Sequence, residues 1–217
     1  MNDMPRVGRG GMFVLLMFVS LNMLAASQEA DEVLEKVRKR YDTVTDAELR
    51  FTEKVRFPMA KIEQQLSGTL FIKKSNKYRV ELDDQVIVTD GQTLWSYSAT
   101  NNQVVIDRFK QDAQSLSPEK VLVGTPDNFT ATTVGEEKVG GYETTILKLI
   151  PKDDQSFIHS LRLWVDEKDW MIRQVEIIDV SEKQTTYAVL QVRTNTGLQD
   201  SRFVYRIPEG AEIVDLR

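Results

Sequence analysis

The pattern of apolar positions divides the chain into an apolar leader, a helical segment and a long series of alternating segments. Residues 29–44 repeat Val, Leu and Tyr at helical spacing with charged residues between them, which predicts an amphipathic helix packed on a core. From Ala47 onward the period changes to two, which is typical of strands. The predicted strands cover residues 47–57, 62–74, 78–82, 86–89, 93–98, 103–107, 129–134, 142–150, 157–165, 170–179, 185–194 and 202–207.

Turn residues separate these segments, and Asp90-Gly91 is the strongest hairpin signal among them. Many short strands without helices between them indicate an antiparallel sheet that curls into a barrel or sandwich. One interruption stands apart, because Ser117-Pro118 has the form of a helix start and Gly124 that of a stop, which predicts a short helix. No linker or repeat divides residues 28–217, so we expect a single domain.

The first 27 residues differ from the rest of the chain. Arg6 and Arg9 give a basic start, residues 12–24 are mostly apolar, and Ala25-Ala26-Ser27 supplies small residues. This arrangement is typical of a secretory signal peptide, so we expect cleavage near Ser27. The apolar run is shorter than the roughly 20 residues of a membrane span, which disfavours the alternative of a retained anchor.

Composition excludes several classes of protein. The 217 residues include 28 Lys and Arg against 33 Asp and Glu, a formal net charge of −5 that disfavours binding to nucleic acid. The absence of Cys excludes disulfides, thiolate zinc sites and a Cys nucleophile. His159 is the single His, and no nucleophile motif accompanies it. Asp83-Asp84 and Asp153-Asp154 fall at turns, where Asp bonds to the local backbone. We therefore predict no catalytic residue, no metal site and no cofactor.

The remaining feature is apolar surface in the first half of the sheet, where Phe51, Phe71, Tyr78, Trp95 and Tyr97 gather. A curved sheet of this size either fills its interior with such side chains or leaves room for an apolar ligand. The pattern alone leaves both possibilities open.

Several stretches resemble the periplasmic outer-membrane lipoprotein carrier family, LolA, over essentially all of the chain after the leader. The most specific lie between residues 68 and 97 and include Gly68-Thr-Leu-Phe-Ile-Lys-Lys-Ser-Asn-Lys-Tyr78 and Val88-Thr-Asp-Gly-Gln-Thr-Leu-Trp-Ser-Tyr97. Residues 50–55, 149–152 and 203–210 are also similar to that family.

The resemblance implies a fold and a task. The fold is an unclosed antiparallel β-barrel whose apolar concave face is covered by a helical lid. The task is to receive acylated lipoproteins from an ATP-driven release complex of the ABC type at the inner membrane. The carrier, expected to be a monomer, shields their acyl chains across the periplasm and delivers them to an outer-membrane acceptor. No covalent chemistry is involved, so we expect no enzyme.

The resemblance also implies site residues, although each could instead serve only core packing. The lipid-binding cavity would be lined by Phe51, Leu70, Ile72, Tyr78, Val80, Trp95 and Tyr97. The lid would contribute Val37 and Tyr41 from the first helix and Val121 and Leu122 from the short one. Lys74 stands where family members carry a basic residue, often Arg followed by Pro, that bonds to the lid backbone and holds the empty carrier closed. A Lys offers a point charge in place of the planar fork of Arg, so we expect a looser latch or none.

Three other kinds of protein are alternatives to a carrier. A related half-barrel sensor that binds an anti-sigma factor usually has a second domain. The outer-membrane acceptor is normally anchored through a Cys after its signal peptide, and the chain has no Cys. A small hydrolase would have only His159 as a His base.

Overall fold

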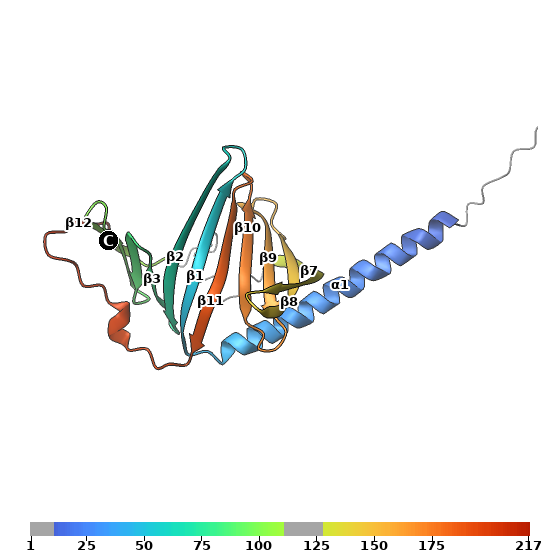
Figure 1. Cartoon of the computed structure of the whole chain (residues 1–217), viewed down its shortest axis with the longest axis horizontal. Coiled ribbons are helices and arrows are strands. Elements are labelled where there is room, and N and C mark those ends of the chain that lie inside the picture. The colour runs from blue at the N-terminus through green and yellow to red at the C-terminus, as the bar shows by residue number, and fades with distance from the viewer. Residues whose placement is uncertain (1–10, 111–127) are drawn as a thin grey trace, which may run out of the picture.

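The computed structural model describes residues 11–110 and 128–217, with side chains from residue 25 onward. Figure 1 shows the helix α1 (Gly11–Asp42) beside a tall curved sheet. The first six strands are β1 (Asp46–Phe57), β2 (Ile62–Lys73), β3 (Lys77–Glu81), β4 (Gln85–Thr89), β5 (Thr93–Ser98) and β6 (Gln103–Arg108). The others are β7 (Phe129–Val139), β8 (Tyr142–Pro151), β9 (Ile158–Asp166), β10 (Ile172–Asp179), β11 (Gln184–Thr194) and β12 (Glu212–Asp215). A 3-10 helix, η1 (Asp200–Phe203), lies between β11 and β12.

The described strands form one sheet in the order β12-β6-β5-β4-β3-β2-β1-β11-β10-β9-β8-β7. Neighbours are antiparallel except β12 and β6, which run parallel. The two ends of the order are not hydrogen-bonded to each other, so the barrel is unclosed. This confirms the predicted fold, an open antiparallel barrel with a helix over it.

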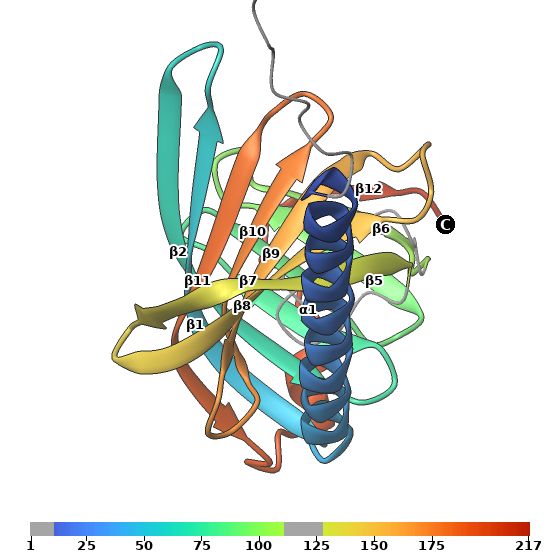
Figure 2. The ribbon, with the colours of Figure 1, turned by 90° about the vertical axis from the view of Figure 1, so that its right-hand side faces the viewer.

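The helix α1 contains the predicted segment but begins earlier. It runs through residues 11–27, the expected signal peptide, and ends at Asp42, two residues before the predicted end. Lys39 and Arg40 occupy its last turn, where cations interact favourably with the helix dipole. Figure 2 shows α1 standing in front of the sheet and crossing β7. Cleavage near Ser27, which stays a prediction, would leave the part of α1 that packs on the sheet.

One face of the sheet, here called the inner face, forms the main core with α1. The register places Leu49 opposite Leu70, Leu70 opposite Val80, and Leu147 opposite Leu163, so these side chains share one face. They belong to the same buried cluster as the helix residues Ala30, Val33, Leu34 and Val37. The apolar stripe of α1 therefore covers this face, as the helical period of residues 29–44 predicts.

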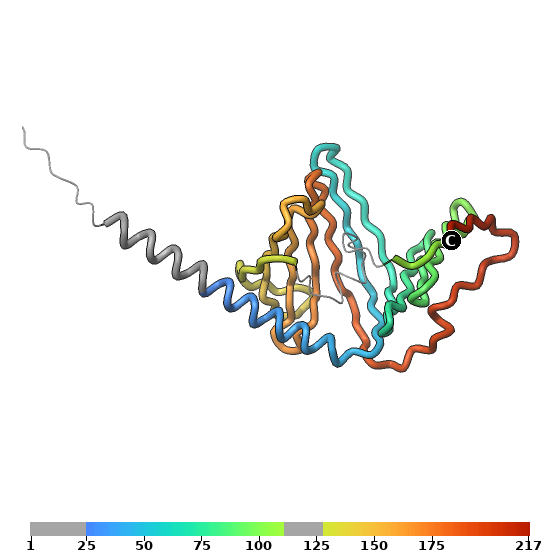
Figure 3. Tube along the Cα trace, turned by 180° about the vertical axis from the view of Figure 1, so that it is seen from behind, coloured from blue at the N-terminus to red at the C-terminus, as the bar shows by residue number. Residues whose placement is uncertain are grey.

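The opposite, outer face has a smaller core of its own over β2 to β6. Phe71, Val88, Val104 and Ile106 are buried there, and the chain after β11 lies close by. Figure 3 shows this chain segment running past the strands that follow β2. Phe203 of η1 is fully buried.

Arg202 places its guanidinium 4.2 Å from the centre of the Phe71 ring. Lys73 and Lys77 each bond to the carboxylate of Asp200, at 2.6 and 2.9 Å. The predicted strand at residues 202–207 is therefore wrong. Its first two residues, Arg202 and Phe203, belong to η1, and the chain after them forms no strand until β12. β12, which was not predicted, joins the sheet instead.

The predicted short helix at residues 117–124, with the lid residues Val121 and Leu122, lies outside the described residues.

Candidate functional site

The inner face holds five of the seven predicted cavity residues. Phe51, Leu70 and Val80 are buried within the main core. Ile72 and Tyr78, which the register pairs with each other, are partly buried and pack against the same core. These side chains of β2 and β3 therefore lie on the inner face, and whether they contact lipid stays a prediction.

Trp95 and Tyr97 do not share that surface. Trp95 pairs with Val88, which pairs with Arg79 and through it with Phe71, all on the outer face. The ring of Tyr97 lies 5.9 Å from that of Tyr205 in the segment after η1. Period two assigns alternate residues to opposite faces but does not say which face is inside, and the register after the Asp90 turn decides it. Trp95 and Tyr97 therefore lie on the outer face, apart from the other five predicted cavity residues.

The lid side of the site is the C-terminal half of α1. Val37 is fully buried against the inner face. The Tyr41 hydroxyl accepts a hydrogen bond from the backbone N–H of Ile172 at 3.3 Å, and burial raises the pKa of Tyr41 well above its ordinary value. Lys36 places its amine 4.4 Å from the centre of the Trp170 ring. Both predicted lid residues on this helix therefore face the sheet.

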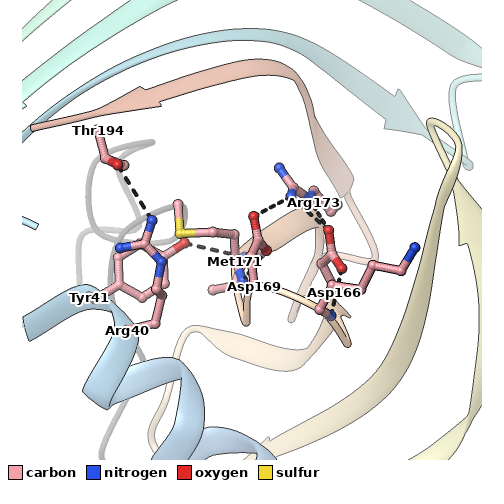
Figure 4. Close-up of polar contacts among 9 residues, drawn as sticks. Arg40, Tyr41, Asp166, Asp169, Met171, Arg173 and Thr194 are labelled. Atoms are coloured by element: carbon pink, nitrogen blue, oxygen red, sulfur yellow. Dashed lines mark hydrogen bonds and ion pairs between the residues drawn. The ribbon is translucent and has the colours of Figure 1, made fainter. Parts of the chain in front are cut away.

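The turn between β9 and β10 presents Ile172 and Trp170 to the helix, and a buried ion pair fixes that turn. Arg173 donates to Asp166 at 2.7 Å and to Asp169 at 2.6 Å, as Figure 4 shows. Arg173 also lies 3.8 Å from the centre of the Tyr142 ring. A different conformation of the turn would separate Arg173 from its carboxylate partners and leave a buried charge unpaired, which is costly in free energy. The ion pairs therefore stabilise the turn in this conformation.

Lys74 lies where the latch is predicted. Its Nζ donates to the backbone oxygen of Asp42, the last residue of α1, at 3.2 Å. Its backbone N–H donates to the oxygen of Thr45 at 3.1 Å. Lys74 therefore contacts the end of the covering helix, and its role as a latch, which the resemblance implies, stays a prediction.

Asn195, which directly follows β11, also holds the chain just after α1. Its side-chain oxygen accepts from the backbone N–H of Thr45 at 2.8 Å, and its amide donates to the oxygen of Thr43 at 3.1 Å. Arg40 adds a bond to the Thr194 hydroxyl at 3.4 Å. Nothing in a turn sequence distinguishes such a residue from any other Asn, because its partners lie about 150 residues away.

One acidic side chain interrupts the apolar inner face. Glu53 pairs across the ladder with Tyr187, whose hydroxyl donates to its carboxylate at 3.1 Å. Partial burial raises the pKa of Glu53, while the Tyr187 hydroxyl and the charge of Lys183 act in the other direction. Glu53 therefore lies on the face that an apolar ligand would contact.

The chemistry of this arrangement is apolar contact with few polar groups. Within residues 11–110 and 128–217, no group of His, Asp and Glu has a geometry that could hold a metal ion. His159 is exposed on β9. Asp153 bonds through its carboxylate to the backbone N–H of Gln155, as expected of a turn residue. In the part of the chain that the structure describes, no helix has both the length and the apolar character needed to cross a membrane.

The amino-acid sequence matches a known protein family over most of its length. Residues 42–206 match the model of the outer membrane lipoprotein carrier protein LolA. The chain is 28% identical over 200 residues to an outer-membrane lipoprotein carrier protein of Pasteurella multocida, covering 91% of this chain and 94% of that one. It is 26% identical over 207 residues to an uncharacterized protein of Methanocaldococcus jannaschii, covering 92% of this chain but only 58% of that longer one.

A solved structure also shares the fold. The crystal structure of an uncharacterized conserved protein from Thermus thermophilus superposes with a TM-score of 0.58 at 18% identity, covering 85% of this chain and 98% of that one. At this identity, the likeness concerns the fold alone.

Proposed function

Because the chain belongs to the LolA family of outer membrane lipoprotein carrier proteins, we propose that it binds the acyl chains of lipoproteins against its inner face and carries them between membranes. In this role the protein shields acyl chains from water and catalyses no reaction.

The physical need for such a carrier follows from the hydrophobic effect. Each buried methylene is worth about 0.8 kcal/mol, so a chain of ~16 carbons exposed to water costs about 12 kcal/mol. A lipoprotein with several chains would therefore leave a bilayer very slowly without an apolar surface to accept them. The carrier must also release its cargo, which favours contacts without strong direction.

The observation that carries the proposal is that one amphipathic helix covers the apolar inner face. Ala30, Val33, Leu34 and Val37 contribute apolar contact to the core. If α1 moves aside, acyl chains can replace these side chains, so apolar contact is exchanged for apolar contact at little net cost. The polar contacts of Tyr41 and Lys74 then set how readily the helix leaves.

The proposed location is the periplasm, reached through the signal peptide predicted at residues 1–27, with the mature protein soluble there. The proposed partners are acylated lipoproteins, an ABC-type release complex in the inner membrane, and an acceptor in the outer membrane. A half-barrel sensor that binds an anti-sigma factor stays an alternative prediction.

The test is to incubate the purified protein with membranes that contain a triacylated lipoprotein and its release complex, without detergent. The lipoprotein should appear in the supernatant as a complex with the carrier and move on when acceptor is added. Lipoprotein that stays in the membrane fraction with a folded carrier present would contradict the proposal.

A further inference from the structure

The β1–β2 hairpin extends beyond the sheet that supports it. The ladder between β1 and β11 ends where Arg56 pairs with Gln184, whereas the ladder between β1 and β2 continues to Phe57 and Ile62. Figures 1 and 3 show this hairpin as the tallest part of the sheet, on the end away from Asp42. Its tip is therefore free to reach another surface.

The tip is apolar and exposed. Met59 is 89% exposed, and Phe57 and Ile62 beside it are also exposed. Three large apolar side chains at the end of a protruding hairpin contribute little to the core of the protein itself. Such a patch on a folded protein commonly marks a site of interaction with a membrane or a partner.

The tip also continues the inner face. The register pairs Phe51 with Gly68, Glu53 with Leu66, and Phe57 with Ile62, all at the same parity along β1. The side chains of Phe57 and Ile62 therefore lie on the same face as Phe51, with Leu66 between them. A mostly apolar strip leads from the main core to the tip, interrupted by Glu53 and by Gln64, which pairs with Val55.

The charge around the tip differs in sign from that of the chain. Residues 54–63 include Lys54, Arg56 and Lys61 against Glu63 alone, a formal net of +2 in a chain of net −5. Glu63 bonds to both Lys54 and Arg56, at 2.9 and 3.3 Å. Apolar side chains flanked by basic ones suit a bilayer with anionic headgroups, because the apolar groups enter the acyl boundary while the cations stay at the phosphates.

We propose that the β1–β2 hairpin tip is a membrane-docking element, which inserts Met59, Phe57 and Ile62 into the surface of a bilayer that contains anionic phospholipid. Docking would bring the outer end of the apolar strip to the bilayer, so that an acyl chain could pass along the inner face. This last step rests on the proposed carrier function, whereas docking itself does not.

The absence of native Cys makes the test specific. Met59→Cys in the full chain is labelled with an environment-sensitive nitrobenzoxadiazole and mixed with vesicles of equimolar phosphatidylethanolamine and phosphatidylglycerol. The matched control is Leu190→Cys, because Leu190 is 63% exposed and lies on β11, outside the hairpin. The leader segment is common to both variants, so its own binding would not produce a difference between the two labels.

We expect the label at position 59 to shift to the blue and brighten, while the label at position 190 stays in an aqueous environment. Adding Lys61→Glu should weaken the vesicle affinity by at least about fivefold, and vesicles of phosphatidylcholine alone should bind more weakly than the anionic vesicles. Binding of a soluble fluorescent acyl probe, measured on the same proteins, should not change. A label at position 59 that stays aqueous with anionic vesicles, shifts only with a purified protein partner, or shifts no more than the label at 190 would overturn the proposal. Loss of acyl-probe binding with docking retained would instead count against the carrier function.

Discussion

The side-chain amine of Lys74 donates a hydrogen bond to the backbone oxygen of Asp42, 3.2 Å away, and so joins the end of β2 to the last residue of α1. The bond is exposed to solvent, which limits its strength, and it connects the covering helix to the sheet beneath it. The choice of side chain at position 74 should therefore affect how readily the helix opens.

Replacing Lys74 by Ala should make α1 easier to displace. An exposed bond of this kind stabilises the closed form by about 1 kcal/mol or less, which corresponds to at most about a fivefold change in opening. Stopped-flow binding of a fluorescent fatty acid would measure the association rate, which should rise. Lys74→Arg, with a planar guanidinium that can donate two bonds, should slow it. Equal rates in all three proteins would show that position 74 does not control opening.

Tyr78→Glu should strongly weaken acyl binding. Tyr78 packs against the core on the inner face and contacts Phe109, with the ring centres 6.2 Å apart. A carboxylate there would have to lose water to let an acyl chain approach, so affinity should fall by about tenfold or more. Equilibrium titration with the same probe measures the loss, and circular dichroism checks the fold. The control is Leu190→Glu, at an exposed position, which should bind the probe normally. Normal binding by Tyr78→Glu would show that Tyr78 does not contact the acyl chain.

Gly68→Ala should destabilise the fold without any direct effect on the hairpin tip. A Cβ at position 68 would lie 2.8 Å from the Phe51 ring and 2.9 Å from the backbone oxygen of Glu81. The backbone atom cannot move aside cheaply, so we expect a loss of about 1–3 kcal/mol in the free energy of unfolding, measured with urea. Ser67→Ala, at the exposed neighbouring position, should change little, and a Gly68→Ala protein as stable as the parent would contradict the packing described.

The attachment of the segment after β11 should depend on pH through Asp200. Its bonds to Lys73 and Lys77 lower the pKa of Asp200 from 3.8 to about 2. Because the folded pKa lies below the unfolded value, this contribution is complete above 3.8 and is lost as the pH falls through about 2. Asp200→Asn should therefore have a lower melting temperature than the parent at neutral pH, and the difference should vanish near pH 2. A constant difference across that range would rule out the ionised carboxylate as its source.

The sequence predicted the strands well because each is bounded by turn residues and alternates cleanly. The position of Lys74 at the end of a strand followed from alternation, whereas its contact with the helix was implied only by the family resemblance. It could not assign Trp95 and Tyr97 to a face, since alternation is symmetric until the register is known. It misread residues 202–207, where Phe203 and Tyr205 alternate as in a strand although the segment lies against the sheet. The hydrogen bonds of Asn195 to Thr43 and Thr45 could not be predicted either, because these partners lie about 150 residues away in the sequence.

The parallel pairing of β12 with β6 has a consequence for synthesis of the protein. Residues 103–106 are made more than 100 residues before their partners at 212–215. Until those partners leave the ribosome, β6 is an unprotected edge with free backbone donors and acceptors that another nascent chain could join. A chain shortened by these few residues would keep β6 as an edge strand, so it should aggregate more readily than the full chain.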